Sequence, residues 1–163
     1  MLVYKYLKRC GIRRDQIRIE PSPPAQGSAE NWVRNKFVKE VNVYRTRHAQ
    51  TKLIVVVDAD TGTVQDRLRQ LDEALKDSGK QAVVPAEQIA RLIPRRNVET
   101  WIRCLNGHDV DEETNYKKWD EVSKLIPQAS ETLYQWTHQS GEPPQHCIDS
   151  LRHGVRELKR LTF

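Results

Sequence analysis

The run LIVVVDADTGT, residues 53–63, constrains the fold of this chain more than any other feature of its sequence. Its first five residues are apolar and mostly β-branched, which favours a strand buried on both faces, as in a parallel sheet. Two carboxylates, Asp58 and Asp60, follow the strand and are separated by one residue, so we expect them to point the same way from an extended exit. Ligands of parallel sheets bind beyond the carboxyl ends of the strands, so this stretch predicts a site as well as a strand.

The part of the chain before this run predicts a helix, a short strand and a second helix. Apolar residues at helical spacing over residues 2–10 indicate a helix that Gly11 ends. Ile17 and Ile19 alternate with polar residues, which favours a short strand. Ser28 is a preferred helix cap, and an apolar stripe follows it at helical spacing: Val33, Phe37, Val41 and Tyr44.

Helical and strand patterns continue to alternate after the run. Thr63 and Gly79 delimit a helix, residues 89–94 are another strand candidate, and Asn97 and Gly107 delimit the next helix. The remaining apolar residues indicate helical segments near residues 122–126, 133–136 and 148–158, and NGHDVDEETNY (106–116) reads as a solvated turn. This order predicts an α/β fold with a small parallel sheet flanked by helices over residues 1–107, and a helical extension over residues 108–163.

Composition narrows the class of protein. Apolar residues make up 37% and charged residues 30% of the chain, which fits a globular domain, and no apolar span or leader is evident. We therefore expect a cytoplasmic protein without membrane contact, and free thiols at its three scattered cysteines. Residues 1–52 carry 12 Lys and Arg against 4 Asp and Glu, whereas residues 53–163 carry 15 against 18. The basic first part favours a polyanionic partner, nucleic acid first.

The candidate site combines three carboxylates with a basic turn. Asp58 and Asp60 supply hard oxygen ligands suited to Mg²⁺ or Mn²⁺. Glu99 stands in the first turn of the helix after the next strand, which would bring it to the same edge of the sheet. Arg95 and Arg96 precede it and would hold phosphate. Helix capping and the helix dipole also favour acidic residues at such positions, so the pattern alone leaves a structural role open.

VVVDADTGT followed by IPRRNVETW resembles a group of prokaryotic Toprim-like proteins, relatives of the topoisomerase–primase fold, over most of the chain. The resemblance implies a metal-dependent nuclease that cleaves phosphodiesters of nucleic acid. DNA is favoured over RNA as the partner, and the sequence leaves the choice between them open. The resemblance also implies a P-loop ATPase as partner, as in the overcoming-lysogenization-defect type of nuclease and other anti-phage defence systems. Asp58 and Asp60 match the DxD of this fold, and Glu99 matches the ETW glutamate of the subgroup. All three are expected to be catalytic and to bind the metal.

Basic side chains of the chain would follow the nucleic-acid backbone on either side of this site. Such contacts depend on salt and are largely blind to sequence. The residues expected to make them are Arg34, Lys36, Lys39, Arg45, Arg47, Arg95 and Arg96.

One part of the family pattern is missing. A Toprim domain normally begins with a strand that ends in a glutamate, and here Met1 lies inside the helix that would follow it. A misassigned start or truncated material, a partner chain or second copy that donates a strand, and a non-catalytic module each explain the difference. Glu20 is a weaker substitute for the missing glutamate.

Three alternatives remain open. A catalytically inactive Toprim-like subunit would bind DNA or a partner ATPase without cleaving. A haloacid-dehalogenase-type phosphatase also places DxD and a threonine after an apolar strand, but the Thr-Gly-Thr spacing here is off by one residue. A nucleotide-sugar transferase would hold a metal diphosphate with DxD, but this chain is short for one.

Overall fold

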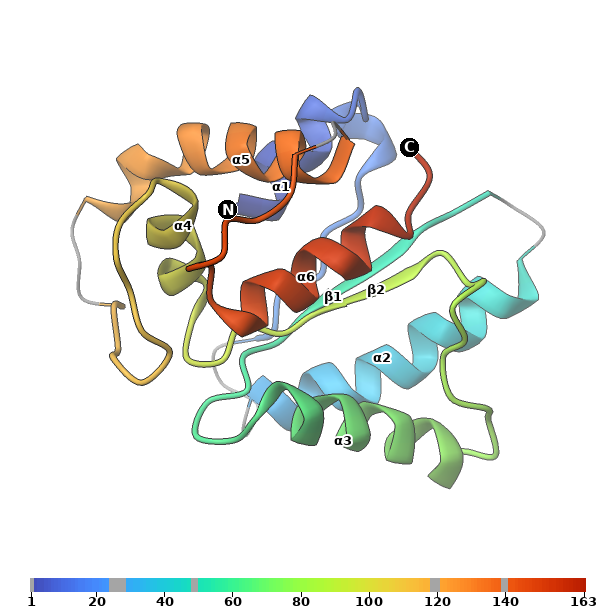
Figure 1. Cartoon of the computed structure of the whole chain (residues 1–163). Coiled ribbons are helices and arrows are strands. Elements are labelled where there is room, and N and C mark those ends of the chain that lie inside the picture. The colour runs from blue at the N-terminus through green and yellow to red at the C-terminus, as the bar shows by residue number, and fades with distance from the viewer. Residues whose placement is uncertain (1, 24–28, 48–49, 118–120, 139–140) are drawn as a thin grey trace.

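The computed structural model describes residues 2–23, 29–47, 50–117, 121–138 and 141–163. Two parallel strands, β1 (Leu53–Val56) and β2 (Ile89–Leu92), pair in register from one end to the other. Helices α2 (Ala29–Thr46) and α3 (Val64–Asp77) lie on one side of this sheet (Figure 1). On the other side lie α1 (Leu2–Arg9), α4 (Val98–Leu105), α5 (Val122–His138) and α6 (Asp149–Lys159), and a short 3₁₀ turn spans Arg14–Gln16. The prediction of a small parallel sheet flanked by helices is therefore confirmed.

Alternate side chains of the two strands point to opposite faces of the sheet and belong to two separate hydrophobic clusters. Leu53, Val55 and Ile89 pack toward α2 and α3, whereas Ala90 and Leu92 pack toward the helices of the other side. Phe37 and Val41, the buried residues of the apolar stripe of α2, belong to the cluster on the side of α2 and α3. Burying both faces of the sheet supplies most of the favourable free energy of such a fold.

Helix boundaries follow the signals in the sequence. The side chain of Thr63 accepts a hydrogen bond from the N–H of Asp66 at the start of α3, and Asn97 does the same for Thr100 at the start of α4. The cap expected from Ser28 lies outside the described residues. Three glycines adopt a left-handed backbone just after their helices, a conformation that costs glycine little: Gly11, Gly79 and Gly107.

Three details of the prediction are wrong. Residues 17–20 form no strand, because Arg18 and Glu20 pair with side chains of α2 instead of placing the backbone in a ladder, and Ile19 is 47% exposed. Strand β1 is not buried on both faces, since Val56 is 39% exposed. The segments expected at 122–126 and 133–136 form one helix, α5, which continues through Pro127.

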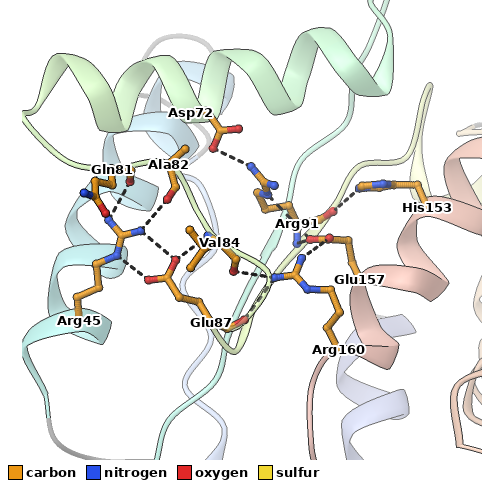
Figure 2. Close-up of polar contacts among 10 residues, drawn as sticks. All are labelled: Arg45, Asp72, Gln81, Ala82, Val84, Glu87, Arg91, His153, Glu157 and Arg160. Atoms are coloured by element: carbon orange, nitrogen blue, oxygen red, sulfur yellow. Dashed lines mark hydrogen bonds and ion pairs between the residues drawn. The ribbon is translucent and has the colours of Figure 1, made fainter.

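The outer edge of β2 is closed by side chains of α6 rather than by another strand (Figure 2). The backbone N–H of Arg91 donates to the Glu157 carboxylate at 2.8 Å, and His153 Nε2 lies 3.1 Å from the Arg91 carbonyl oxygen. The Arg91 guanidinium reaches Asp72 on α3 at 2.8 Å. These contacts satisfy backbone groups that an open edge would offer to a further strand.

The last two helices pack into the main body of the protein. Apolar residues of α5 and α6 belong to the same hydrophobic cluster as those of α1, α4 and β2. The boundary at residue 107 stays a prediction. No helix in the described part of the chain combines the length and the apolar character needed to cross a membrane. Cys104 and Cys147 are buried, and both are free thiols, as is Cys10.

Candidate functional site

The structure places Asp58 and Glu99 at the carboxyl end of the sheet. Backbone pairing continues past the last residue of β1, because the N–H of Ala59 donates to the Pro94 carbonyl at 2.8 Å. Asp58 therefore lies where both strands end. The chain that leaves β2 turns directly into α4, and Glu99 occupies the first turn of that helix. The prediction that two neighbouring strand ends bring these carboxylates together is thus consistent with the observed topology.

Asp58 is held where its charge is disfavoured. The pKa of Asp58 is raised from its ordinary 3.8 to about 6, mainly by burial and to a smaller degree by the negative charges of Glu99 and Asp60, against the lowering effect of Lys117. Glu99 and Asp60 therefore lie near enough to Asp58 to influence its carboxylate. A carboxyl group with such a pKa is typical of sites that bind or react.

Asp60 does not continue the extended exit that the sequence suggested. Its φ of 59° lies in the left-handed region, which aspartate tolerates better than most residues, and its side chain is exposed. The chain then turns toward the cap of α3 through the hydrogen bond from Gly62 N–H to the Ala59 carbonyl. The expectation of an extended segment through Asp60 is therefore wrong.

Lys117 is a member of this site that the sequence did not reveal. Its Nζ lies 3.7 Å from Asp58 Oδ2. It follows the stretch that reads as a solvated turn, fifty-nine positions after Asp58. The one sequence signal that this segment lies at the site is the acidic character of residues 106–116, whose charge is opposite to that of Arg95 and Arg96.

The two arginines before α4 are engaged within the chain. Arg95 forms an ion pair with the Glu113 carboxylate. Arg96 Nε donates to the Glu113 carbonyl oxygen at 2.9 Å, and its Nη1 donates to the Asp60 carbonyl oxygen at 3.4 Å. Arg96 therefore reaches the backbone of Asp60, and the guanidinium groups of both arginines contact this protein's own acceptors.

The donor set fits a hard divalent cation in type and in charge. A cation would relieve the repulsion that Glu99 and Asp60 impose on the half-buried Asp58 carboxylate. In the described part of the chain, no three side chains of His, Cys, Asp or Glu converge into a full ligand set. Mg²⁺ often takes only one or two carboxylates and completes its shell with waters and substrate phosphates. The residues present therefore suit an ion of that kind rather than one enclosed by protein ligands.

The basic side chains of α2 are mostly paired. Lys36 Nζ lies 2.7 Å from Glu20 and 3.2 Å from Glu40. Arg45 pairs with Glu87 at 2.6 Å (Figure 2) and also donates to two backbone carbonyls. Arg34 donates to an asparagine of its own helix, and Lys39 and Arg47 are exposed. Contact of these residues with nucleic acid stays a prediction, and the structure gives Arg45 a structural role.

Glu20 and the free side of β1 border a small groove. Its volume is about 140 Å³, and it is lined by residues 18 and 20, by α2 and by β1. Glu20 pairs there with Lys36 and with Arg18, which lies 3.5 Å away. These cations lower the pKa of Glu20, so it stays ionised. A strand-donating partner at β1 stays a prediction.

Comparison with known proteins gives one partial likeness. The chain resembles part of a secretion system protein. Over 117 residues it is 29% identical to the ESX-3 secretion system protein EccE3 of Mycobacterium tuberculosis, in each of two strains. The aligned region covers 71% of this chain and 34% of EccE3, so the chain spans about a third of the length of the curated relatives that it matches. No family model and no solved structure matches the chain.

Proposed function

We propose that this chain is a Toprim-like domain whose strand-end carboxylates bind Mg²⁺ or Mn²⁺ and that it cleaves phosphodiester bonds of nucleic acid, DNA rather than RNA. The observation that carries the proposal is Asp58. Its carboxylate lies half-buried where β1 and β2 end, and two neighbouring carboxylates disfavour its ionised form. A divalent ion beside it would offset that cost and would leave coordination positions for a phosphate.

The residues have distinct roles in this proposal. Asp58 and Asp60 hold the ion, and Glu99 adds negative charge from the first turn of α4. The bound ion supplies Lewis acidity and a lowered pKa of water. Arg95 and Arg96 stabilise negative charge on the phosphate once they leave Glu113. A P-loop ATPase partner, a role in anti-phage defence and a cytoplasmic location belong to the same proposal through the Toprim resemblance.

Nicking of supercoiled plasmid tests the activity. We expect the wild type to nick DNA in Mg²⁺ or Mn²⁺ and not in EDTA. Asp58→Asn and Asp60→Ala should reduce nicking to background, because each removes an oxygen ligand. Asp77→Asn, at the exposed end of α3, removes the same charge away from the site and should keep full activity. Equal nicking by Asp58→Asn and the wild type would refute the proposal.

A non-catalytic module is the second candidate, because Lys117 and Glu113 already pair with the site's charges. The likeness to part of a secretion system protein also carries no nuclease chemistry. Under this second proposal the domain binds DNA or a partner ATPase without cleaving it. Metal-independent retention of DNA by both the wild type and Asp60→Ala, with no nicking by either, would favour the module.

A further inference from the structure

The segment from Asp111 to Lys117 touches both charged halves of the proposed site. At its end, the Lys117 ammonium lies 3.7 Å from the Asp58 carboxylate, where the proposed metal ion would bring positive charge. In its middle, the Glu113 carboxylate pairs with Arg95, where a phosphate would bring negative charge. One short segment therefore presents a cation to the acidic half and an anion to the basic half.

The segment keeps its shape through its own hydrogen bonds. Asp111 Oδ1 accepts from the N–H of Glu113 at 2.7 Å and from that of Thr114 at 2.6 Å, and Thr114 Oγ1 donates to Asp111 Oδ2 at 2.8 Å. Asn115 Oδ1 accepts from the N–H of Lys117 at 3.0 Å. Such side-chain-to-backbone bonds stabilise a defined turn, so Glu113 and Lys117 are presented together.

The segment is also attached to the body of the protein on both sides. Asn97 Nδ2, at the cap of α4, donates to Asn115 Oδ1 at 3.2 Å. The backbone N–H of Ser150 on α6 donates to Glu112 Oε1 at 3.0 Å. The Arg103 guanidinium lies 4.8 Å from the centre of the Tyr116 ring. These contacts hold the segment beside the carboxyl end of the sheet, although most of its residues are exposed, as expected for a solvated turn.

We propose that residues 111–117 are a built-in occupant of the site, in which Lys117 takes the place of the cation and Glu113 takes the place of the phosphate. The inference rests on the proposed function, since it names how that same site is regulated. A divalent ion at Asp58 must displace the Lys117 ammonium, and a phosphate at Arg95 must displace the Glu113 carboxylate. The segment therefore weakens the binding of both ligands until it moves aside.

Paired charge-removing variants test this inference. Lys117→Met removes the internal cation, and Glu113→Gln removes the internal anion. An exposed ion pair supplies matched controls. Lys124 of α5 and Glu121, the residue just before this helix, lie 3.0 Å apart, and their side chains are 75% and 70% exposed. Lys124→Met and Glu121→Gln make the same chemical changes without touching the site.

Two binding measurements on the full chain read out the two halves. Titration of Mn²⁺, followed by the electron paramagnetic resonance signal of the free ion, reports the acidic half. Fluorescence anisotropy of a short labelled DNA oligonucleotide in EDTA reports the basic half. We expect Lys117→Met to tighten Mn²⁺ binding and Glu113→Gln to tighten DNA binding, each by about two- to fivefold, as removal of one partly exposed ion pair allows. The control variants should match the wild type.

Each other outcome decides against the inference. If the wild type and Lys117→Met bind Mn²⁺ with equal affinity, Lys117 does not occupy the cation position, although the proposed metal site is still supported. Weaker Mn²⁺ binding by Lys117→Met would overturn the inference too, and would show that Lys117 positions the carboxylates. If no form binds Mn²⁺ or DNA, the proposed function fails together with its regulation. Tightening by the control variants as well would show an effect of net charge alone.

Discussion

At the scale of single residues, the half-buried position of Asp58 disfavours its ionised form. Burial, Glu99 and Asp60 raise its pKa from 3.8 to about 6, so the folded protein prefers the protonated form more than the unfolded chain does. The stabilising effect of this preference is complete below about pH 4 and is lost as the pH rises through about 6. Above that pH the ionised carboxylate lowers the free energy of unfolding.

Asp58→Asn should therefore stabilise the protein at pH 8 and have little effect at pH 4. The full shift in pKa corresponds to about 3 kcal/mol. Because the side chain is 34% exposed and solvent screens it, we expect a gain of about 1 kcal/mol. Urea denaturation at both pH values measures it, with Asp77→Asn as the control. A gain that is equal at pH 4 and pH 8 would contradict the argument.

The positions of Asp58 and Glu99 at the strand ends could be predicted from the sequence, whereas the position of Lys117 beside Asp58 could not. Asp58 and Glu99 follow local patterns, a β-branched run and a helix start, that fix where a residue lies relative to a strand end. Lys117 reaches Asp58 only through the path of a segment without periodicity. Its position depends on contacts with distant residues, such as those of Asn97 with Asn115 and of Ser150 with Glu112, which no local pattern encodes.

At the scale of elements, α6 depends on a close approach to α4. Trp101 of α4 is buried, and its Nε1 donates to Ser150 Oγ on α6 at 2.7 Å. The ring lies directly against Gly154, since a Cβ atom at that position would be 2.4 Å from Trp101 Cη2. A glycine inside a helix lowers its stability, so its presence here reflects the space that the indole needs.

Gly154→Ala should lower the free energy of unfolding by about 1–3 kcal/mol through overpacking against Trp101. The higher helix propensity of alanine offsets about 1 kcal/mol of the strain. Arg156→Ala, on the exposed side of the same helix, should change stability by less than about 0.5 kcal/mol. Chemical denaturation followed by Trp fluorescence compares the two. An unchanged or stabilised Gly154→Ala would show that the ring moves aside freely.

Elements with strong caps and apolar stripes were predictable, whereas those decided by distant partners were not. Thr63, Asn97 and the glycines mark the ends of α3 and α4 because the signals act within one turn. The alternation of Ile17 and Ile19 failed to predict structure, because a strand needs a neighbouring backbone and this segment contacts α2 through side chains. Two separate segments were expected where α5 is one helix that contains Pro127, and packing of Ala129 and Leu133 in the core accompanies this continuity.

At the scale of the whole molecule, a polar network joins the two sides of the sheet (Figure 2). The Arg160 guanidinium contacts the Glu157 carboxylate and donates to the Val84 carbonyl at 3.2 Å, and Glu87 pairs with Arg45 of α2. Glu157 also accepts from the backbone of Arg91 in β2. The network therefore links α2, the chain before β2, β2 itself and α6, which lie around both hydrophobic clusters.

Glu157 is the member of this network whose loss should cost most. It is only 6% exposed and faces Arg160 and Arg91. Glu157→Gln keeps the size of the side chain but removes the carboxylate that Arg160 pairs with, whereas Arg91 keeps its pair with Asp72. We expect the free energy of unfolding to fall by about 2–3 kcal/mol, with one cooperative transition seen by both circular dichroism and Trp fluorescence.

Glu142→Gln is the control. Its carboxylate is 84% exposed and lies 3.8 Å from Lys159, so the substitution should lower the free energy of unfolding by less than about 0.5 kcal/mol. Equal losses in the two variants would show that the network adds little to stability. Two separated transitions in Glu157→Gln would instead show that this carboxylate couples the unfolding of the two clusters.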